Sequence, residues 1–257
     1  GEPLFPVEER PVPASDVPGE EAWPTQPFPV KPEPLHPLTI HPEDAWGVTE
    51  DDRLYCEAQL KSLRYEGAFT PPSIDGTLIY PGFAGGINWG GVAVHREENL
   101  LVTTVISIPF WVRLTEREPG STSGNQIGTP FHMSRAALMS PSGLPCTPPP
   151  WGRLVAIDLE TGDKRWDVPL GTMKGLEEVE GAEAWGSLAM GGPITTAGGL
   201  IFIGGAMDDK LRAFDVDTGE ELWSADLPAG GQATPMTYML DGTQYVVIAA
   251  GGHANLG

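Results

Sequence analysis

The sequence predicts an all-β fold made of repeated antiparallel strands. Three short apolar runs at 200–203, 211–214 and 221–223 are separated by polar or glycine-rich dipeptides and tripeptides, a pattern typical of consecutive strands joined by tight turns. In addition, LVAIDLETGDKRW (154–166) and LRAFDVDTGEELW (211–223) share Ala, Asp, Thr-Gly and Trp at the same offsets. An internal repeat built from strands indicates the blades of a propeller or of a related array.

Each part of the repeat A-x-D-x-x-T-G-x-x-x-W has a physical role. The aspartate accepts hydrogen bonds from the amides of the turn, and the glycine supplies a positive φ angle. The tryptophan lies on the following strand, where we expect its indole to insert between neighbouring sheets. The repeated tryptophans are therefore predicted to be structural.

Composition excludes some classes of function. The 257 residues include 33 Gly and 27 Pro, which favours many turns and few long helices. With 15 Lys and Arg against 35 Asp and Glu, the net charge of -20 argues against a nucleic-acid partner, because phosphate binding needs clustered cations. No apolar stretch is long enough to span a membrane, and the N-terminus has no signal-like segment.

The order of patterns along the chain predicts two parts. Residues 1–48 are rich in proline and are expected to form neither a ladder nor a helix, but to drape as an extended segment over a folded body at 49–257. An amphipathic pattern predicts one short helix over 50–63. Strands are predicted at 77–80, 91–95, 100–106 and 108–114, an irregular segment at 115–150, then the two repeats and a hairpin that turns at Asp241-Gly242.

Two further expectations concern the cysteines and the ends of the chain. Cys56 and Cys146 either form one disulfide in an oxidising compartment or remain two buried thiols, and neither has a metal-binding spacing. Gly1-Glu2 resembles the end of a Thr-Gly-Glu turn, and the chain stops shortly after the predicted strand at 245–250. We therefore expect a fragment of a longer protein, truncated at both ends.

Several motifs, in order, resemble one family. RYEGAFTPPSIDGTLIYPG, INWGG, GLPCTPPPWG, GGPITTAGGLIFIGGAMDDKLRAFD and LPAGGQATPMTY are similar to the C-terminal part of membrane-bound quinoprotein glucose dehydrogenases, which depend on pyrroloquinoline quinone (PQQ). The resemblance implies the C-terminal blades of an eight-bladed β-propeller, with PQQ on its axis and a divalent cation, Ca or Mg, beside it. It also implies oxidation of an aldose such as glucose to its lactone at the periplasmic face of the inner membrane, with electrons passed to ubiquinone.

The resemblance also places the catalytic groups. The general-base aspartate, the lysine that contacts the quinone and the main cation ligands are all expected upstream, so no catalytic residue or metal ligand is assigned here and the fragment is expected to be inactive alone. The resemblance instead implies a pocket wall, where each residue also has an ordinary structural alternative: a surface histidine, a strand residue, core filler or a blade staple. The predicted wall residues are His253, Thr104, Met190, Gly191, Gly192, Gly252 and Trp89.

Two alternative functions remain open. One is oxidation of quinate or shikimate, which the same family includes. The other is a non-catalytic propeller scaffold that assembles outer-membrane complexes and shares the tryptophan repeat. The glycine-rich segments GGPITTAGG, LPAGGQATPMTY and GGH favour an enzyme, since glycine lets a backbone approach a cofactor closely. Gln126, Thr129 and His132 are predicted to lie in a loop that either roofs the substrate entrance or is simply solvated.

Overall fold

A computed structural model describes residues 2–122, 124–176 and 178–252. The chain divides into two compact units. Unit 1 comprises Gly1–Val30, Pro37–Gly85 and Ile108–Pro148, and unit 2 comprises Lys31–His36, Gly86–Ser107 and Pro149–Gly257. None of the helices among the described residues is long and apolar enough to cross a membrane.

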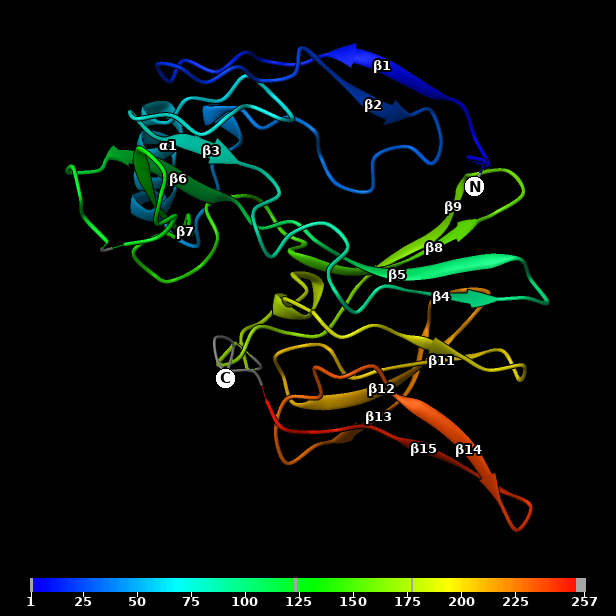
Figure 1. The fold of residues 1–257 in the computed structure, drawn as a ribbon. Coiled ribbons are helices and arrows are strands. Elements are labelled where there is room, and N and C mark those ends of the chain that lie inside the picture. Colours follow the sequence, from blue (N-terminus) through cyan, green and yellow to red (C-terminus); the bar gives the residue numbers. More distant parts are fainter. Residues whose placement is uncertain (1, 123, 177, 253–257) are drawn as a thin grey trace. The chain divides into compact units, whose positions relative to one another are not determined.

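Unit 1 contains two small antiparallel sheets and the α-helix. Strands β1 (Val7–Pro11) and β2 (Thr25–Pro29) form one sheet, and β3 (Thr77–Ile79), β6 (Phe110–Glu116) and β7 (Phe131–Ala137) form the other in the order β3-β6-β7. The 3-10 turn η1 (Pro42–Asp44) precedes α1 (Glu50–Ser62), which lies beside β3 and β6 (Figure 1).

The helix confirms the predicted span closely. Thr49 caps its N-terminus, because the Thr49 hydroxyl accepts a hydrogen bond from the Asp52 amide at 3.1 Å. Three acidic residues in the first turn suit the positive end of the helix dipole. The apolar face of α1 packs into a core formed with β3 and the segment after β7: Ile40, Ala45, Cys56, Leu60, Leu78, Tyr80, Leu138 and Cys146.

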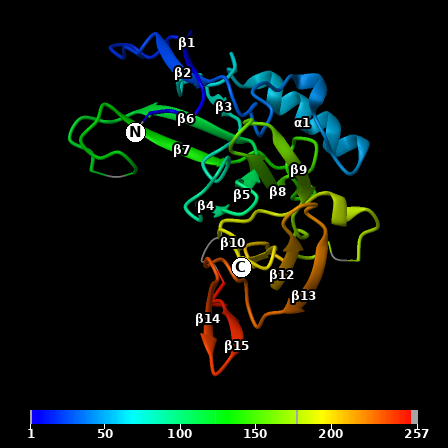
Figure 2. The ribbon, with the colours of Figure 1, turned by 90° about the vertical axis from the view of Figure 1, so that its right-hand side faces the viewer.

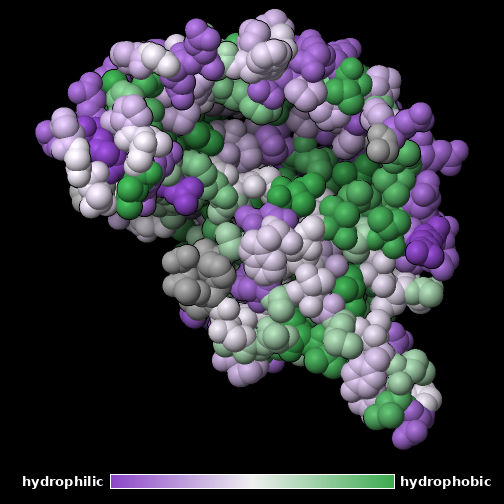
Figure 3. Space-filling model, in the orientation of Figure 1, coloured by the Kyte–Doolittle hydropathy of each residue, from purple (hydrophilic) through white to green (hydrophobic). Residues whose placement is uncertain are grey.

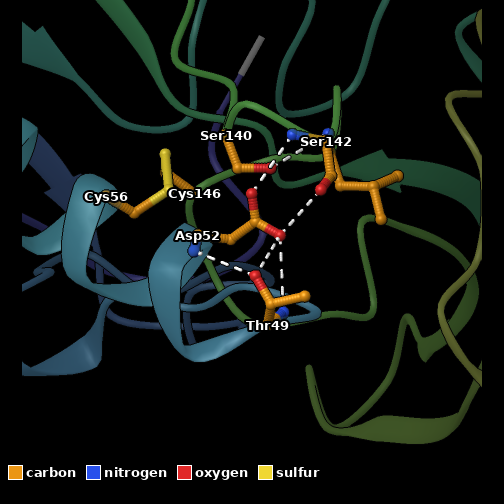
Figure 4. The surroundings of a disulfide bond; sticks show 7 residues. Thr49, Asp52, Cys56, Ser140, Ser142 and Cys146 are labelled. Carbon is orange, nitrogen blue, oxygen red and sulfur yellow. Dashed lines mark hydrogen bonds between the residues drawn. A yellow bond between two sulfur atoms is a disulfide. The ribbon is translucent and has the colours of Figure 1, made fainter.

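The two cysteines are joined in a disulfide, which decides between the two alternatives. Cys56 of α1 bonds to Cys146, and both residues are fully buried. Beside the bond, the Asp52 carboxylate accepts hydrogen bonds from the Ser142 hydroxyl at 2.8 Å and the Ser142 amide at 3.1 Å (Figure 4). The Ser142 hydroxyl is the main cause that lowers the pKa of Asp52. A covalent and a polar link therefore hold α1 to the same loop.

The proline-rich segment was wrongly predicted to form no ladder. Strands β1 and β2 pair with Glu8 opposite Phe28, flanked by hydrogen bonds from the Val12 amide to Pro24 O and from the Val30 amide to Pro6 O. Amides of an antiparallel strand point alternately toward and away from the partner. The prolines of both strands occupy positions whose amides would point away from the partner strand, so the lack of an N–H removes no hydrogen bond between the strands.

The segment 115–150 was also wrongly predicted to be irregular throughout. Strand β6 extends to Glu116, and β7 pairs with it along its whole length, from Phe110 opposite Ala137 to Glu116 opposite Phe131. Strand β7 is an edge strand of the sheet, and among the described residues it pairs with β6 alone; none of its residues is buried. Such a strand needs no apolar alternation, which is why FHMSRAA carries a weak sequence signal.

Unit 2 contains two four-stranded antiparallel sheets and a hairpin, shown in Figures 1 and 2. The first sheet has the order β4 (Val92–His95), β5 (Leu100–Ile106), β8 (Gly152–Asp158) and β9 (Lys164–Pro169). The second has β10 (Ile194–Thr195), β11 (Leu200–Ile203), β12 (Lys210–Asp215) and β13 (Glu221–Asp226). The 3-10 turn η2 (Ala182–Ala184) lies between the sheets in sequence, and β14 (Met236–Leu240) and β15 (Thr243–Val247) form the predicted hairpin at Asp241-Gly242.

The repeat folds identically in the two sheets. Ala156 pairs with Trp166 and Ala213 with Trp223, and each pair is followed by a register shift. In both turns the repeat aspartate accepts two amide hydrogen bonds, and the repeat glycine has a φ of 73°. The sheets pack face to face around one core: Leu100, Val102, Leu154, Ala156, Trp166, Leu170, Ala189, Ile201, Ile203, Phe214 and Val216.

Trp166 confirms the predicted docking of one blade on the next. Its indole is 9% exposed, and its Nε1 donates a hydrogen bond to Val216 O at 2.8 Å. A Cβ at Gly219 would lie 2.7 Å from the Trp166 ring, so the glycine of the second repeat makes room for the tryptophan of the first. Trp223, at the equivalent position of the second repeat, is 49% exposed.

Candidate functional site

Two glycine turns of unit 2 lie backbone against backbone. Gly90 lies between Trp89 and β4, and Met190-Gly191-Gly192 leads into β10. A Cβ on Gly90 would lie 2.5 Å from Met190 O and even closer to the Gly192 amide, and a Cβ on Gly192 would collide with Gly90 O. Any larger residue at these positions would have to push the two turns apart.

Further turns join the same cluster. A Cβ on Gly191 would lie 2.6 Å from Gln232 O, and one on Gly205 would lie 2.9 Å from Gly191 O. The Gly252 amide donates a hydrogen bond to Gly230 O at 2.9 Å. We name this set, residues 89–91, 190–192, 204–206, 230–232 and 252, the glycine cluster.

Gln232 is the side chain that holds the cluster together, and sequence analysis missed it. It is 5% exposed, its Oε1 accepts from the Met190 amide at 3.2 Å, and its Nε2 donates to Ala206 O at 3.3 Å. One amide side chain thus bridges two of the other turns. The position of this glutamine between Gly-Gly and Ala-Thr could have indicated its role, because a long polar side chain that is buried among tight turns must have hydrogen-bond partners.

Buried polar groups also fix the segments on either side. The Ser187 hydroxyl accepts from the Met207 amide at 2.9 Å. Asp208 and Arg212 form a buried ion pair, with Nη1 and Oδ1 2.8 Å apart, and Asp208 also accepts from the Thr172 amide at 2.9 Å. Burial opposes the charge of Arg212, yet its contacts with Asp208 and Glu221 leave its pKa raised, so it remains a cation.

Four of the predicted residues contact other turns of the glycine cluster: Met190, Gly191, Gly192 and Gly252. A fifth, Trp89, precedes Gly90 in the same turn. Gly191 and Gly192 are buried under neighbouring turns, whereas Met190 is partly open and Trp89 is 59% exposed. His253 lies outside the described residues. The remaining candidate, Thr104, has a different position.

Thr104 lies on β5, where its ladder partner is Leu154, and it is 2% exposed. The preceding residue makes the contact with the cluster, because the Thr103 hydroxyl donates to Gly91 O at 3.0 Å. Side chains alternate along a strand, so Thr104 points to the opposite face, the one that carries Leu100 and Val102. Thr103 therefore contacts the turn at Gly91, whereas Thr104, one residue later, faces the core.

The three polar residues of the predicted entrance loop belong to unit 1. Gln126, Thr129 and His132 lie at the end of the β6–β7 hairpin. The Thr129 hydroxyl donates to Gln126 O at 2.9 Å, and the Arg117 guanidinium donates to backbone carbonyls of the same loop. These bonds are internal to the hairpin.

Several groups of the cluster suit a flat heterocycle. Met190 offers a polarisable thioether and is partly exposed, and Trp89 offers an aromatic face and is largely exposed. A cation site is a different matter: among the described residues, no three His, Cys, Asp or Glu side chains are grouped to bind a metal.

Blades with a docked tryptophan and converging glycine turns define unit 2 as part of a β-propeller. Residues 1–246 match the PQQ family described as glucose/ethanol/alcohol dehydrogenase, beta-propeller domain. The chain therefore belongs to the family of PQQ-dependent quinoprotein dehydrogenases.

Individual relatives agree. Quinoprotein glucose dehydrogenase A of Acinetobacter calcoaceticus is 40% identical over 100% of this chain and 34% of its own length. The quinate/shikimate dehydrogenase of Acinetobacter baylyi is 37% identical over 98% of the chain and 34% of its own length. The crystal structure of quinohemoprotein alcohol dehydrogenase from Comamonas testosteroni matches with a TM-score of 0.50 and 27% identity, over 68% of this chain and 24% of that one. The chain spans about a third of the length of the curated relatives it matches.

Proposed function

We propose that this chain is the C-terminal portion of a PQQ-dependent dehydrogenase that oxidises an aldose, with glucose converted to gluconolactone, and passes electrons to ubiquinone. The observation that carries the proposal is the match to the glucose dehydrogenase of Acinetobacter calcoaceticus over the whole chain. The PQQ ring, when bound, supplies the two-electron acceptor for the alcohol. In this chain the glycine cluster forms one wall of its pocket, with Met190 at the edge of the ring.

The rest of the machinery is expected outside this chain. The general-base aspartate, the quinone-contacting lysine and most ligands of a Ca or Mg ion are assigned to upstream residues, so the fragment alone is inactive. His253 follows Gly251-Gly252 and is proposed to bind a substrate hydroxyl. The Thr103 hydroxyl contact with Gly91 supports Thr103 as the residue beside the pocket, with Thr104 behind it.

The disulfide supports a location outside the cytoplasm. Buried disulfides persist in oxidising compartments such as the periplasm. We therefore propose that the protein works at the periplasmic face of the inner membrane, with its membrane anchor in another part of the protein.

Oxidation of quinate or shikimate is the second candidate, because the quinate/shikimate dehydrogenase of Acinetobacter baylyi is nearly as similar. A non-catalytic scaffold is less well supported, because the chain matches the PQQ dehydrogenase family over residues 1–246 and is similar to dehydrogenases over nearly its whole length. The test is to produce the full-length protein, load it with PQQ and Ca or Mg, and compare glucose with quinate using a ubiquinone analogue as acceptor. Activity on glucose but not quinate supports the first proposal, and the reverse supports the second.

Two variants test the pocket wall. Gly192→Ala should weaken PQQ binding and also disturb the packing of the blades, because its Cβ would collide with Gly90 O. Gly198→Ala is the matched control, since its nearest neighbour is 3.9 Å away and its φ is not positive. Equal PQQ affinity in the two variants would remove the glycine cluster from the pocket. An unchanged KM in His253→Ala would remove His253.

A further inference from the structure

Trp89 is unlike the tryptophans that hold the blades together. Trp151 and Trp166 are 0% and 9% exposed. Trp223 is 49% exposed, but it occupies the docking position of the repeat and has a structural assignment. Trp89 is 59% exposed and belongs to neither repeat. The docking role of the repeat tryptophans therefore does not account for Trp89.

The backbone under Trp89 is firmly held. The Asn88 Oδ1 accepts from the Trp89 amide at 2.7 Å, and the Gly91 amide donates to Asn88 O at 3.0 Å, which closes a tight turn. Gly90 is wedged against Met190 and Gly192, as described above. An exposed aromatic ring on a fixed backbone can bind a ligand with little loss of conformational freedom, because only two side-chain torsions remain to be ordered.

The surface that follows Trp89 is apolar. Val92 and Val94 of β4 are 48% and 46% exposed, and Ile87, before the turn, is 47% exposed. Figure 3 shows apolar side chains gathered over the β4–β5 part of unit 2. On the other side, the Trp89 turn touches Met190, which the proposed function sets at the edge of the cofactor ring.

We propose that the Trp89 indole is a stacking platform for the ring of a cyclic polyol, a pyranose or a cyclohexane carboxylate such as quinate. One face of such a ring presents several C–H groups, which are apolar and slightly positive, and the π face of an indole is slightly negative. Trp89 would thereby favour ring-shaped substrates over linear polyols. The inference rests on the proposed function and deepens it, because it names the substrate feature that this wall recognises.

The size of the effect follows from the type of contact. Pairs of aromatic rings contribute roughly 0.5–1.5 kcal/mol beyond the buried area. If a C–H face on an indole contributes in the same range, the affinity changes by about 2- to 13-fold. We expect Trp89→Ala to raise the KM for glucose or quinate by that factor and to leave kcat nearly unchanged. Trp89→Phe keeps a π face and should restore most of the affinity.

The experiment uses the full-length protein saturated with PQQ and a divalent cation. KM and kcat are measured for glucose, quinate and glycerol in the wild type, Trp89→Ala and Trp89→Phe. Trp23→Ala is the matched control, since Trp23 is 74% exposed and lies in unit 1. A rise in KM confined to the ring-shaped substrates and rescued by Phe supports the platform.

Other results overturn it. An unchanged KM in Trp89→Ala, or the same rise for glycerol, shows that the indole does not recognise a ring. A loss of PQQ affinity in Trp89→Ala assigns the indole to the cofactor instead. If the wild type oxidises none of the three, the proposed function fails, and calorimetric binding of methyl α-glucoside then decides: weaker binding in Trp89→Ala than in the wild type supports the platform, whereas equal or absent binding refutes it.

Discussion

Removal of the Cys56–Cys146 disulfide should destabilise unit 1 by several kcal/mol. The two cysteines are 90 residues apart in sequence, and a cross-link over a loop of that length removes chain entropy worth about 4.6 kcal/mol from the unfolded state. Because both residues are fully buried in the core around α1, the double variant Cys56→Ala, Cys146→Ala also loses packing. We therefore expect a loss of about 4–5 kcal/mol or more.

Urea unfolding with and without reductant separates the bond from the packing. Reductant present during unfolding should lower the wild-type midpoint toward that of the double variant and leave the variant itself unchanged. Mass spectrometry after thiol alkylation checks that the Cys56–Cys146 disulfide has formed in the purified protein. The reasoning is refuted if the two proteins unfold at the same urea concentration under oxidising conditions.

Three further predictions concern stability. Trp166→Ala should lower the free energy of urea unfolding by about 3–5 kcal/mol, because it removes a buried indole and its hydrogen bond to Val216 O. Trp223→Ala in this chain should lower it by less than about 1 kcal/mol, because Trp223 is half exposed. Similar losses in the two variants would contradict the docking role of Trp166. Burial, with a smaller contribution from Tyr80, raises the pKa of Tyr65 to about 12. The contribution of Tyr65 to stability is therefore complete below about pH 10 and is lost as the pH rises toward 12. When unfolding is measured as a function of pH, Tyr65→Phe should lack this loss of stability at alkaline pH. The pKa of Asp52 is lowered, so its contribution to stability is present above about pH 4 and is lost as the pH falls further. In Asp52→Asn the free energy of unfolding should depend less on pH in the acid range than in the wild type. The same pH dependence in both proteins would argue against the Ser142 contact.

Local chemistry explains which elements the sequence predicts well. The helix over 50–62 has a capping threonine, acidic residues in its first turn and a regular apolar face, and the structure follows all three. The repeats are equally predictable, because their turns are fixed by an aspartate and a glycine within a few residues of each other. Interactions of this kind are local in sequence and do not depend on the tertiary contacts of the rest of the chain.

The errors arise where a distant partner decides. Pro27 and Pro29 are compatible with a strand only because the register with β1 turns their positions outward, and no local pattern reveals a register. Strand β7 exists because β6 offers it an edge. Thr104 remains a prediction as a pocket residue, because the structure shows only that Thr103 makes the contact with Gly91 and that the alternation of β5 places Thr104 on the opposite face.

The glycine cluster changes the physical explanation of the site. The glycine-rich sequence predicts a backbone that approaches a cofactor closely, but a Cβ on Gly90, Gly191 or Gly192 would meet the backbone of another turn. The glycines therefore let turns of successive blades approach one another. Among the described residues of the cluster, the non-glycine side chains that remain accessible are Trp89 and, in part, Met190. For this reason a substitution of either side chain should alter ligand binding without unfolding the blades, whereas a substitution of Gly192 should disturb both.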